Sequence, residues 1–324
     1  MQEETFTAVI DRQSRSDGEG LTPLHLAAIS GNLTVLSVLV TSSPDMLDTR
    51  DKAGHTALHW AVVCGHGGCV RLLCERGAGV RLADSGGGSP LHYAAMADNT
   101  RMLETLLGAG ADPAMEDAAG RTACSWAASS GALASFVSMI RRHPGALVTR
   151  DAQSLTPVHC AAALGHGEII TASVEAGAAL EMEDSDGATP LFYAAKHGHI
   201  ECVKILVKCG AKVNHTDHWG RTPVMCGVVS GKVSIVTLLS EAGADFESAT
   251  RDGDTCLHLA VARRDYDIAS WIASHSPRIV SKPNRAEVSP LHLVCNINEV
   301  KICKLLIESN CEINPIYTLY TKKK

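Results

Sequence analysis

A seven-residue phrase recurs along this chain at a nearly constant interval, and this recurrence limits what the chain can fold into. The phrase reads Thr-Pro-Leu-His-Leu-Ala-Ala from Thr22 and Ser-Pro-Leu-His-Tyr-Ala-Ala from Ser89. Nine copies succeed one another at intervals of 33 or 34 residues, and they begin at Thr22, Thr56, Ser89, Thr122, Thr156, Thr189, Thr222, Thr255 and Ser289. A period of this length indicates stacked copies of one small unit rather than several unrelated globular domains.

Each copy carries the signals of a helix, a loop and a second helix. The Thr or Ser is a preferred N-cap, because its hydroxyl accepts a hydrogen bond from an amide of the first turn. Apolar residues at helical spacing, such as Ile200, Val203 and Leu206, predict the second helix. A glycine 21 residues after the cap, as at Gly77 and Gly110, ends that helix in left-handed backbone. The predicted fold class is therefore all-α.

Three repeats are 34 residues long, and they end in a different way. Ser43, His143 and Ser276 replace the terminal glycine, and a proline follows each of them. Because proline stops a helix, we predict one alternative turn in these three repeats and a local change of twist.

The repeated pattern resembles the ankyrin repeat, in which a T-P-L-H-x-A box recurs every 33 residues. The resemblance covers residues 17–314; residues 1–16 are a polar N-terminal segment that we interpret as a remnant of a preceding repeat, and residues 315–324 form a C-terminal tail. It implies an ankyrin-repeat solenoid of stacked helix pairs with short β-hairpin or turn fingers. The run Gly-Asn-Leu-Thr-Val-Leu, with the boxes that follow it, is also similar to inversin-type ciliary scaffolds.

Composition narrows the classes of partner. A formal net charge of −6 argues against a general binder of nucleic acid or of membrane surfaces. The sequence has no run of 18 apolar residues, so we expect no membrane insertion. The twelve cysteines form no C-x-x-C pair, which favours free thiols in a reducing compartment. We expect a monomeric, cytoplasmic protein, and the nucleus, the cilium and the cytoskeleton stay open as alternative locations.

The chain lacks the motifs of catalysis and of metal binding. It contains no G-x-S-x-G elbow, no phosphate-binding G-x-x-x-x-G-K-[ST] loop and no H-E-x-x-H helix. Six histidines share the box position, so we interpret them as structural. His215 and His218 form an H-x-x-H pair, but a closed zinc site needs about four ligands, and we expect this segment to be an exposed finger tip. We therefore expect no enzyme, no metal and no cofactor.

The positions that the repeat leaves variable are the candidates for function. The resemblance implies that ligands meet the finger tips and the concave face of the first helices. In repeats six to eight these positions combine an aromatic residue with several cations, which is typical of binding hot spots. The candidate partner-binding residues are Lys196, His197, His218, Trp219, Arg221, Arg251, Asp254 and Arg263.

The resemblance implies a non-enzymatic protein–protein interaction module that acts as an adaptor or scaffold. Two alternatives stay open: a regulatory or targeting part of a larger enzyme or channel, and a ciliary or cytoskeletal structural scaffold. The first is favoured by the C-terminal end, which has no polar capping helix. The resemblance also implies hydroxylation of a finger asparagine that follows a leucine by eight residues, and Asn214 and Asn314 fit this spacing.

Overall fold

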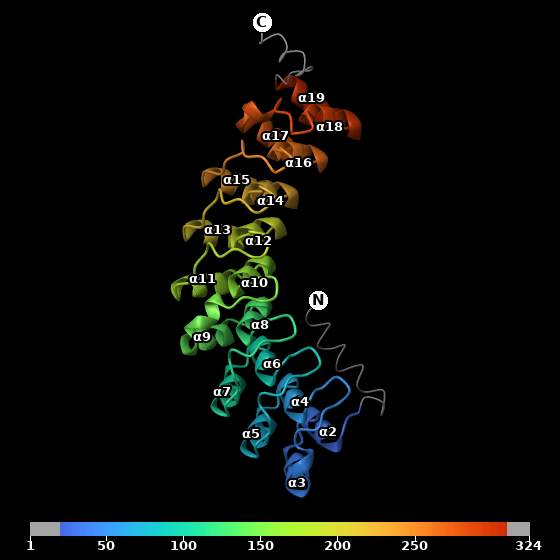
Figure 1. Ribbon diagram of the computed structural model, residues 1–324, viewed down its shortest axis with the longest axis vertical. Helices are drawn as coiled ribbons and strands as arrows, with labels where there is room; N and C mark the ends of the chain where they lie inside the picture. The colour runs from blue at the N-terminus through green and yellow to red at the C-terminus, as the bar shows by residue number, and fades with distance from the viewer. Residues whose placement is uncertain (1–19, 310–324) are drawn as a thin grey trace. The chain divides into compact units, whose positions relative to one another are not determined.

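The structure is a computed structural model that describes residues 20–309 (Figure 1). Within this range every repeat folds as the predicted pair of helices. The first helices of the pairs are α2 (Pro23–Ile29), α4 (Ala57–Val63), α6 (Pro90–Met96), α8 (Ala123–Ser130), α10 (Pro157–Leu164), α12 (Pro190–His197), α14 (Pro223–Ser230), α16 (Cys256–Ala262) and α18 (Pro290–Ile297). The second helices are α3 (Leu33–Ser42), α5 (Gly67–Glu75), α7 (Thr100–Gly108), α9 (Leu133–Arg142), α11 (Gly167–Glu175), α13 (Ile200–Lys208), α15 (Val233–Glu241), α17 (Tyr266–His275) and α19 (Val300–Glu308).

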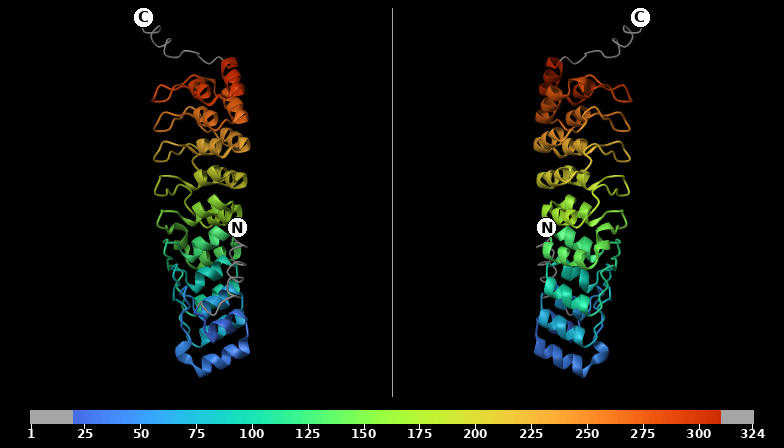
Figure 2. Two further views of the ribbon diagram at one scale, coloured as in Figure 1. Left: turned by 90° about the vertical axis from the view of Figure 1, so that its right-hand side faces the viewer. Right: turned by 90° about the vertical axis from the view of Figure 1, so that its left-hand side faces the viewer.

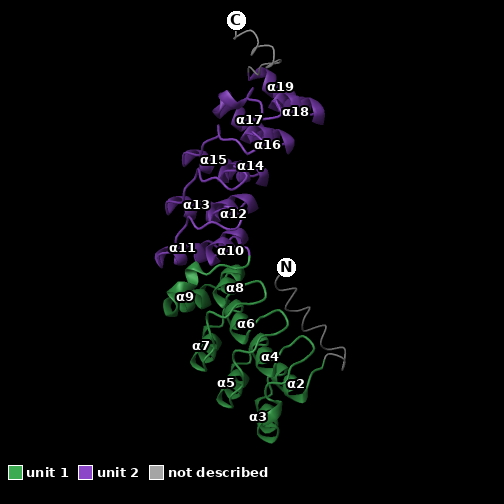
Figure 3. Ribbon diagram, viewed as in Figure 1, with its two compact units in different colours: residues 1–152 green, residues 153–324 purple. Residues whose placement is uncertain are grey.

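The helix pairs fall into two compact units, residues 1–152 and residues 153–324 (Figure 3). Within each unit a first helix packs against the first helices of the neighbouring repeats, as α12 does against α10 and α14. Paired alanines such as Ala194 and Ala195 are fully buried in these contacts, and their small side chains let the helix backbones approach closely. The core of each unit is therefore a layer of small and branched apolar side chains that runs from repeat to repeat.

The three long repeats contain the predicted alternative turn. Short 3-10 helices follow the second helices at η1 (Pro44–Met46), η2 (Pro144–Val148) and η3 (Pro277–Ile279), and each begins at the proline. This confirms that the extra residue and the proline form one structure. The change of twist stays a prediction.

The fingers are turns that project from one side of the stack in each unit (Figures 1 and 2). Among residues 20–309 they contain a single isolated β-bridge, between Glu116 and Thr122. Neighbouring fingers of one unit are joined by a backbone hydrogen bond. The N–H of Ala118 donates to the carbonyl of Gly86 at 2.9 Å, and the N–H of Arg251 donates to the carbonyl of Trp219 at 2.7 Å. The tips are thus held in register from one repeat to the next.

The box histidines are structural, as predicted, and they also connect repeats. His59 is fully buried; its Nδ1 lies 2.9 Å from the hydroxyl of its own N-cap, Thr56, and accepts the N–H of Thr56 at 3.1 Å. Its Nε2 lies 3.2 Å from the carbonyl of Gly88, in the next finger. His25, His92, His159 and His258 repeat this arrangement. One imidazole therefore caps its helix and fixes the next finger.

This burial predicts a loss of stability in weak acid. Burial, together with the nearby charge of His55, lowers the pKa of His59 to about 4, from 6.5 in the unfolded chain. Above pH 6.5 both states hold a neutral imidazole; as the pH falls toward 4, the unfolded chain takes up the proton first, so folding loses about 3 kcal/mol from this group alone. We expect urea denaturation to give a lower free energy of unfolding at pH 5 than at pH 7.

A variant that cannot titrate at this position provides the control. His59→Gln keeps a hydrogen-bonding side chain and is expected to lose less stability than the natural chain between pH 7 and pH 5. Burial alone would lower the pKa of the neighbouring His55, but its contacts with Asp84 and Asp51 raise it, so His55 acts in the opposite direction. Identical pH dependences of the two proteins would contradict this account of His59.

Candidate partner-binding surface

The finger of repeat seven is held in shape by a buried carboxylate. The side chain of Asp217 is inaccessible to solvent, and its Oδ1 accepts the N–H groups of Trp219 at 2.9 Å and Arg221 at 2.8 Å. Its Oδ2 accepts the Nε–H of Arg221 at 2.6 Å. The backbone of the tip is thus fixed before any partner arrives.

Trp219 lies at this tip with its indole in solvent. The residue is 44% exposed, and the guanidinium carbon of Arg221 lies 4.8 Å from the centre of the ring. A cation over an aromatic face is an attractive pair, and here it holds the indole beside a positive charge. The pair presents apolar area and charge together, which is the composition found at the centres of protein interfaces.

A small hollow connects this finger to the first helix of repeat six. Its volume is about 30 Å³, and its lining includes Asp186, Tyr193, Lys196 and Arg221. The hydroxyl of Tyr193 donates to the buried Asp184 of its own repeat at 2.6 Å, which fixes the ring that lines the hollow. Lys196 and Arg221, both among the predicted binding residues, therefore line one hollow.

The other predicted residues surround this centre or lie apart from it. The backbone N–H of His218 donates to the carbonyl of Asp186 at 2.9 Å, and its exposed side chain lies close over Gly187. His197 is exposed and stacks on Tyr193, with ring centres 6.3 Å apart; partial desolvation of the ring and the neighbouring Lys196 lower its pKa.

Arg251, Asp254 and Arg263 belong to repeat eight. Arg251 is exposed on the next finger. Asp254 is half-buried, and its Oδ1 accepts the side-chain amide of Asn284 at 2.8 Å, so this carboxylate braces two fingers. Arg263 is exposed at the C-cap of α16, in the loop between the paired helices of the repeat. Of the predicted residues, Lys196 and Arg221 thus line one hollow, and Trp219 lies against Arg221.

The expected exposed H-x-x-H tip is only half right. His218 is exposed, but His215 is half-buried: its Nε2 lies 3.0 Å from the carbonyl of Gly187 and 3.4 Å from a carboxylate oxygen of Glu183, and its ring packs on Phe192. Repeat six has Phe192 in place of the box histidine, and His215 fills the space beside it. Among residues 20–309, no three His, Cys, Asp or Glu side chains gather as a group that could hold a metal ion.

Asn214 is exposed, and its side chain joins two repeats. Its Nδ2 donates to the carbonyl of Gly243 at 3.0 Å, and its Oδ1 accepts the N–H of Asp245 at 2.8 Å. Hydroxylation at Asn214 stays a prediction, for which the mass of the intact protein is the measurement. Asn314 lies outside the described residues, as do the segments 1–16 and 315–324.

Comparison with known families decides the classification. The family model "Ankyrin repeats (3 copies)" matches residues 3–84, 91–175, 125–217, 159–250 and 209–283, and the model "Ankyrin repeat" matches residues 287–316. The chain belongs to the ankyrin-repeat family. Ankyrin repeats are non-catalytic protein-interaction modules, so protein binding is the general activity of this fold.

Two curated relatives are similar over short segments. Ankyrin repeat and SOCS box protein 2 from Bos taurus is 38% identical over 79 residues, 24% of this chain and 12% of the relative. Palmitoyltransferase AKR1 from Mortierella alpina is 38% identical over 62 residues, 19% of this chain and 11% of the relative. The chain thus spans about an eighth or less of each of these proteins.

None of the helices between residues 20 and 309 is both long enough and apolar enough to cross a membrane.

Sequence reasoning missed the carboxylates that brace the ankyrin fingers. Asp51 accepts the indole N–H of Trp60 at 3.0 Å, and Asp117 that of Trp126 at 2.8 Å. The signal was present: an Asp stands five residues before many of the caps, and an aromatic residue four after some of them. The same pairing, between Asp184 and Tyr193, holds the Tyr193 ring in the lining of the hollow.

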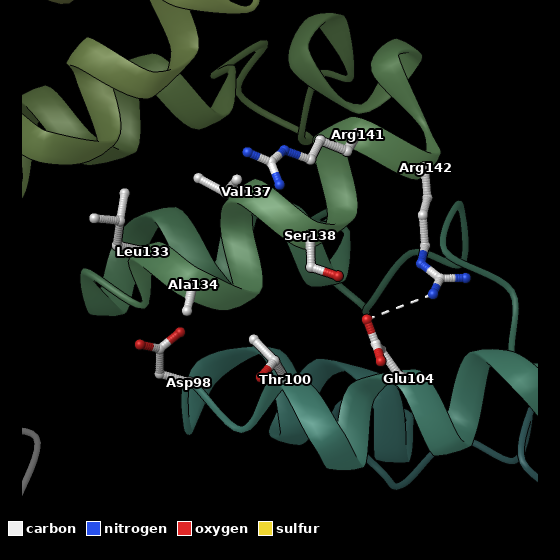
Figure 4. Close-up of a pocket in the computed structure, with 9 residues that line it drawn as sticks. All are labelled: Asp98, Thr100, Glu104, Leu133, Ala134, Val137, Ser138, Arg141 and Arg142. Carbon is white, nitrogen blue, oxygen red and sulfur yellow. Dashed lines mark ion pairs between the residues drawn. The ribbon is translucent and has the colours of Figure 1, made fainter.

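The ankyrin repeats also form a wider groove, between the second helices α7 and α9 (Figure 4). Its volume is about 700 Å³, and Arg142 approaches Glu104 across it at 3.5 Å. Apolar Leu133 and Val137 lie on one side and Thr100 on the other. None of the predicted binding residues lies here, and both charges of the pair are more than half exposed.

Proposed function

We propose that this ankyrin-repeat protein is an adaptor that binds a partner protein through the fingers and first helices of repeats six to eight. We define the finger–helix surface as Lys196, His197, His218, Trp219, Arg221, Arg251 and Arg263. The observation that carries the proposal is the exposed indole of Trp219, held by Arg221 on a finger that Asp217 makes rigid. Because Trp219 and Arg221 are already held in place, a partner loses little binding energy to ordering these two side chains.

A variant that tests this function must leave the finger of repeat seven folded. Arg221 is unsuitable, because its removal would leave the buried Asp217 without its ion pair. We therefore choose the pair Trp219→Ala and Arg251→Ala. The matched control is Tyr266→Ala with Arg278→Ala, because Tyr266 is also 44% exposed and Arg278 is an exposed cation of the same unit.

The test is quantitative proximity labelling of the full chain in cells, followed by affinity measurement with the partner found. Truncation of a binding hot spot costs about 2 kcal/mol or more, so the double variant is expected to weaken binding about thirtyfold or more. The control pair is expected to stay within about twofold. Unchanged binding by a folded Trp219→Ala/Arg251→Ala protein would contradict the proposal.

A second candidate is that these repeats serve as the recruiting arm of a larger assembly. The relatives supply the specific support, because their names combine ankyrin repeats with a SOCS box in one case and denote a palmitoyltransferase in the other. Co-purification of the chain with an enzymatic subunit whose substrates are lost in the Trp219→Ala/Arg251→Ala variant would favour this candidate over a simple adaptor. The ciliary or cytoskeletal scaffold stays a prediction from the sequence.

A further inference from the structure

The loops between paired helices contain a repeated structural device. Gly31 and Gly165 adopt left-handed backbone, and the histidine of the following repeat covers each of them. His66 donates through Nε2 to the carbonyl of Ile29 at 3.0 Å, and His199 donates to the carbonyl of Ala163 at 3.0 Å. In these two repeats the side chain over the glycine is a histidine whose Nε2 is already hydrogen-bonded to a carbonyl of the preceding repeat.

In repeats seven and eight a cation covers the corresponding glycine. Lys232 stands at the histidine position, whereas in repeat eight Asp265 holds that position and Arg263 reaches the glycine from two residues before it. A Cβ on Gly198 would come within 3.4 Å of the Lys232 side chain, and a Cβ on Gly231 within 3.0 Å of Nη2 of Arg263. Neither cation forms a side-chain hydrogen bond or an ion pair with any residue between 20 and 309, although Asp265 lies beside Arg263. Their donors therefore stay available to a ligand.

These two cations continue a row that begins at Lys196. Lys196 lies in the last turn of α12, just before Gly198, and Lys232 directly follows Gly231. We define the cation row as Lys196, Lys232 and Arg263. All three side chains are exposed. Val229, which is 42% exposed, lies on α14, between α12, which carries Lys196, and α16, whose C-cap is Arg263 (Figure 1). Lys196 also lines the hollow beside Arg221, so the row is continuous with the finger–helix surface.

Asp186 lines the hollow beside Lys196, whereas three other carboxylates of these loops bond elsewhere. Oδ1 of Asp265 accepts the N–H of Ile268 at 3.1 Å and caps α17. Glu201 pairs with Lys204 at 2.7 Å, and Glu299 lies 3.8 Å from Arg264. A cation near a helix C-terminus is favoured by the helix dipole, but Lys232 forms no bond to a carbonyl such as those that His66 and His199 make. Helix stability alone does not explain the change from histidine to Lys232.

We propose that the cation row binds an extended acidic segment of the partner protein. The three charges belong to successive repeats rather than to one hollow, so their ligand is elongated and carries carboxylates at intervals, with space for an apolar side chain at Val229. Nucleic acid is the less favoured polyanion, because a chain of net charge −6 repels it and three cations are few for phosphate-backbone binding. The inference rests on the proposed function and specifies the chemistry of its partner.

The probe is a fluorescein-labelled peptide of about ten glutamates, followed by anisotropy with the full chain at low and at moderate salt. The test variant is Lys196→Glu/Lys232→Glu/Arg263→Glu. The control is Lys208→Glu/Lys301→Glu/Lys304→Glu, which changes the net charge equally on exposed lysines of the second helices α13 and α19. We expect the natural chain to bind the peptide, salt to weaken binding, and the test variant to lose at least about tenfold in affinity while the control stays within about twofold.

Three results would overturn the proposal: no binding of the peptide by the natural chain at low salt, equal loss in both triple variants, or tighter binding of an oligothymidylate of equal charge. None of these results depends on Trp219. If the cation row fails and the Trp219→Ala/Arg251→Ala variant still loses its partner, the proposed function stands and only the acidic segment is excluded. If the peptide test fails and the Trp219→Ala/Arg251→Ala variant also keeps its partner, the finger–helix surface is not the binding site.

Discussion

Replacing Gly87 with alanine is expected to destabilise the first unit by about 4 kcal/mol. Gly87 has a φ of +80°, and a Cβ there would lie 2.4 Å from the backbone nitrogen of Ala118 and within 3 Å of backbone atoms of Asp117. These atoms belong to the next finger, which is hydrogen-bonded at this point through Ala118 and Gly86. The cost combines left-handed backbone for a non-glycine residue, about 1–2 kcal/mol, with displacement of packed backbone, about 1–3 kcal/mol.

Gly110→Ala separates these two contributions. Gly110 has a φ of +92°, but no atom lies within 4 Å of the site of its Cβ. Its substitution is therefore expected to cost only the backbone term, about 1–2 kcal/mol. Urea denaturation of both variants measures the difference. Equal destabilisation by the two substitutions would contradict the close stacking of the fingers.

Asp117→Ala is expected to have a comparable effect, about 3–5 kcal/mol. The side chain is inaccessible to solvent and accepts the N–H groups of Ala119 and Arg121, each at 2.9 Å, and the indole N–H of Trp126 at 2.8 Å. Burial alone would raise the pKa of Asp117, but these donors and the Arg121 side chain lower it, so the carboxylate is ionised. Its loss leaves several donors without an acceptor and removes a buried ion-pair partner.

Asp112→Ala is the matched control in the same repeat. Asp112 is exposed, and its Oδ1 accepts one N–H, that of Ala114, at 3.0 Å. We expect a loss of about 1 kcal/mol or less. The free energy of unfolding in urea distinguishes the two variants. A loss as small at Asp117 as at Asp112 would mean that the carboxylate does not hold the finger.

The fold follows from the sequence because its signals repeat. The cap residues Thr22 and Ser289, separated by eight periods, begin helices of the same kind, so each copy supports the interpretation of the others. The prolines after Ser43 and His143 also predicted a turn that the structure contains. Contacts between repeats were harder to predict. The bond from His59 to Gly88 joins residues 29 apart, and only the stacking geometry brings them together.

The candidate surface was predicted less completely, for a physical reason. Trp219 was recognisable because a large aromatic residue on a polar turn has no core to enter, and it is indeed exposed. The role of Arg221 was not recognisable, since its ion pair with Asp217 requires the folded turn. Lys232 was missed because it lies in the loop between paired helices, ten residues after the cap, and its place over Gly198 depends on the neighbouring repeat.

The most direct test of the finger–helix surface is site-specific photocrosslinking in cells. Benzoylphenylalanine replaces Trp219 in one protein and Tyr266 in another, so that two equally exposed aromatic positions are compared. We predict that irradiation links position 219, and not position 266, to a discrete partner protein, and that Lys196→Glu/Lys232→Glu/Arg263→Glu reduces this product. The absence of a linked protein at position 219, or the same products from both positions, would contradict the proposal that repeats six to eight bind the partner.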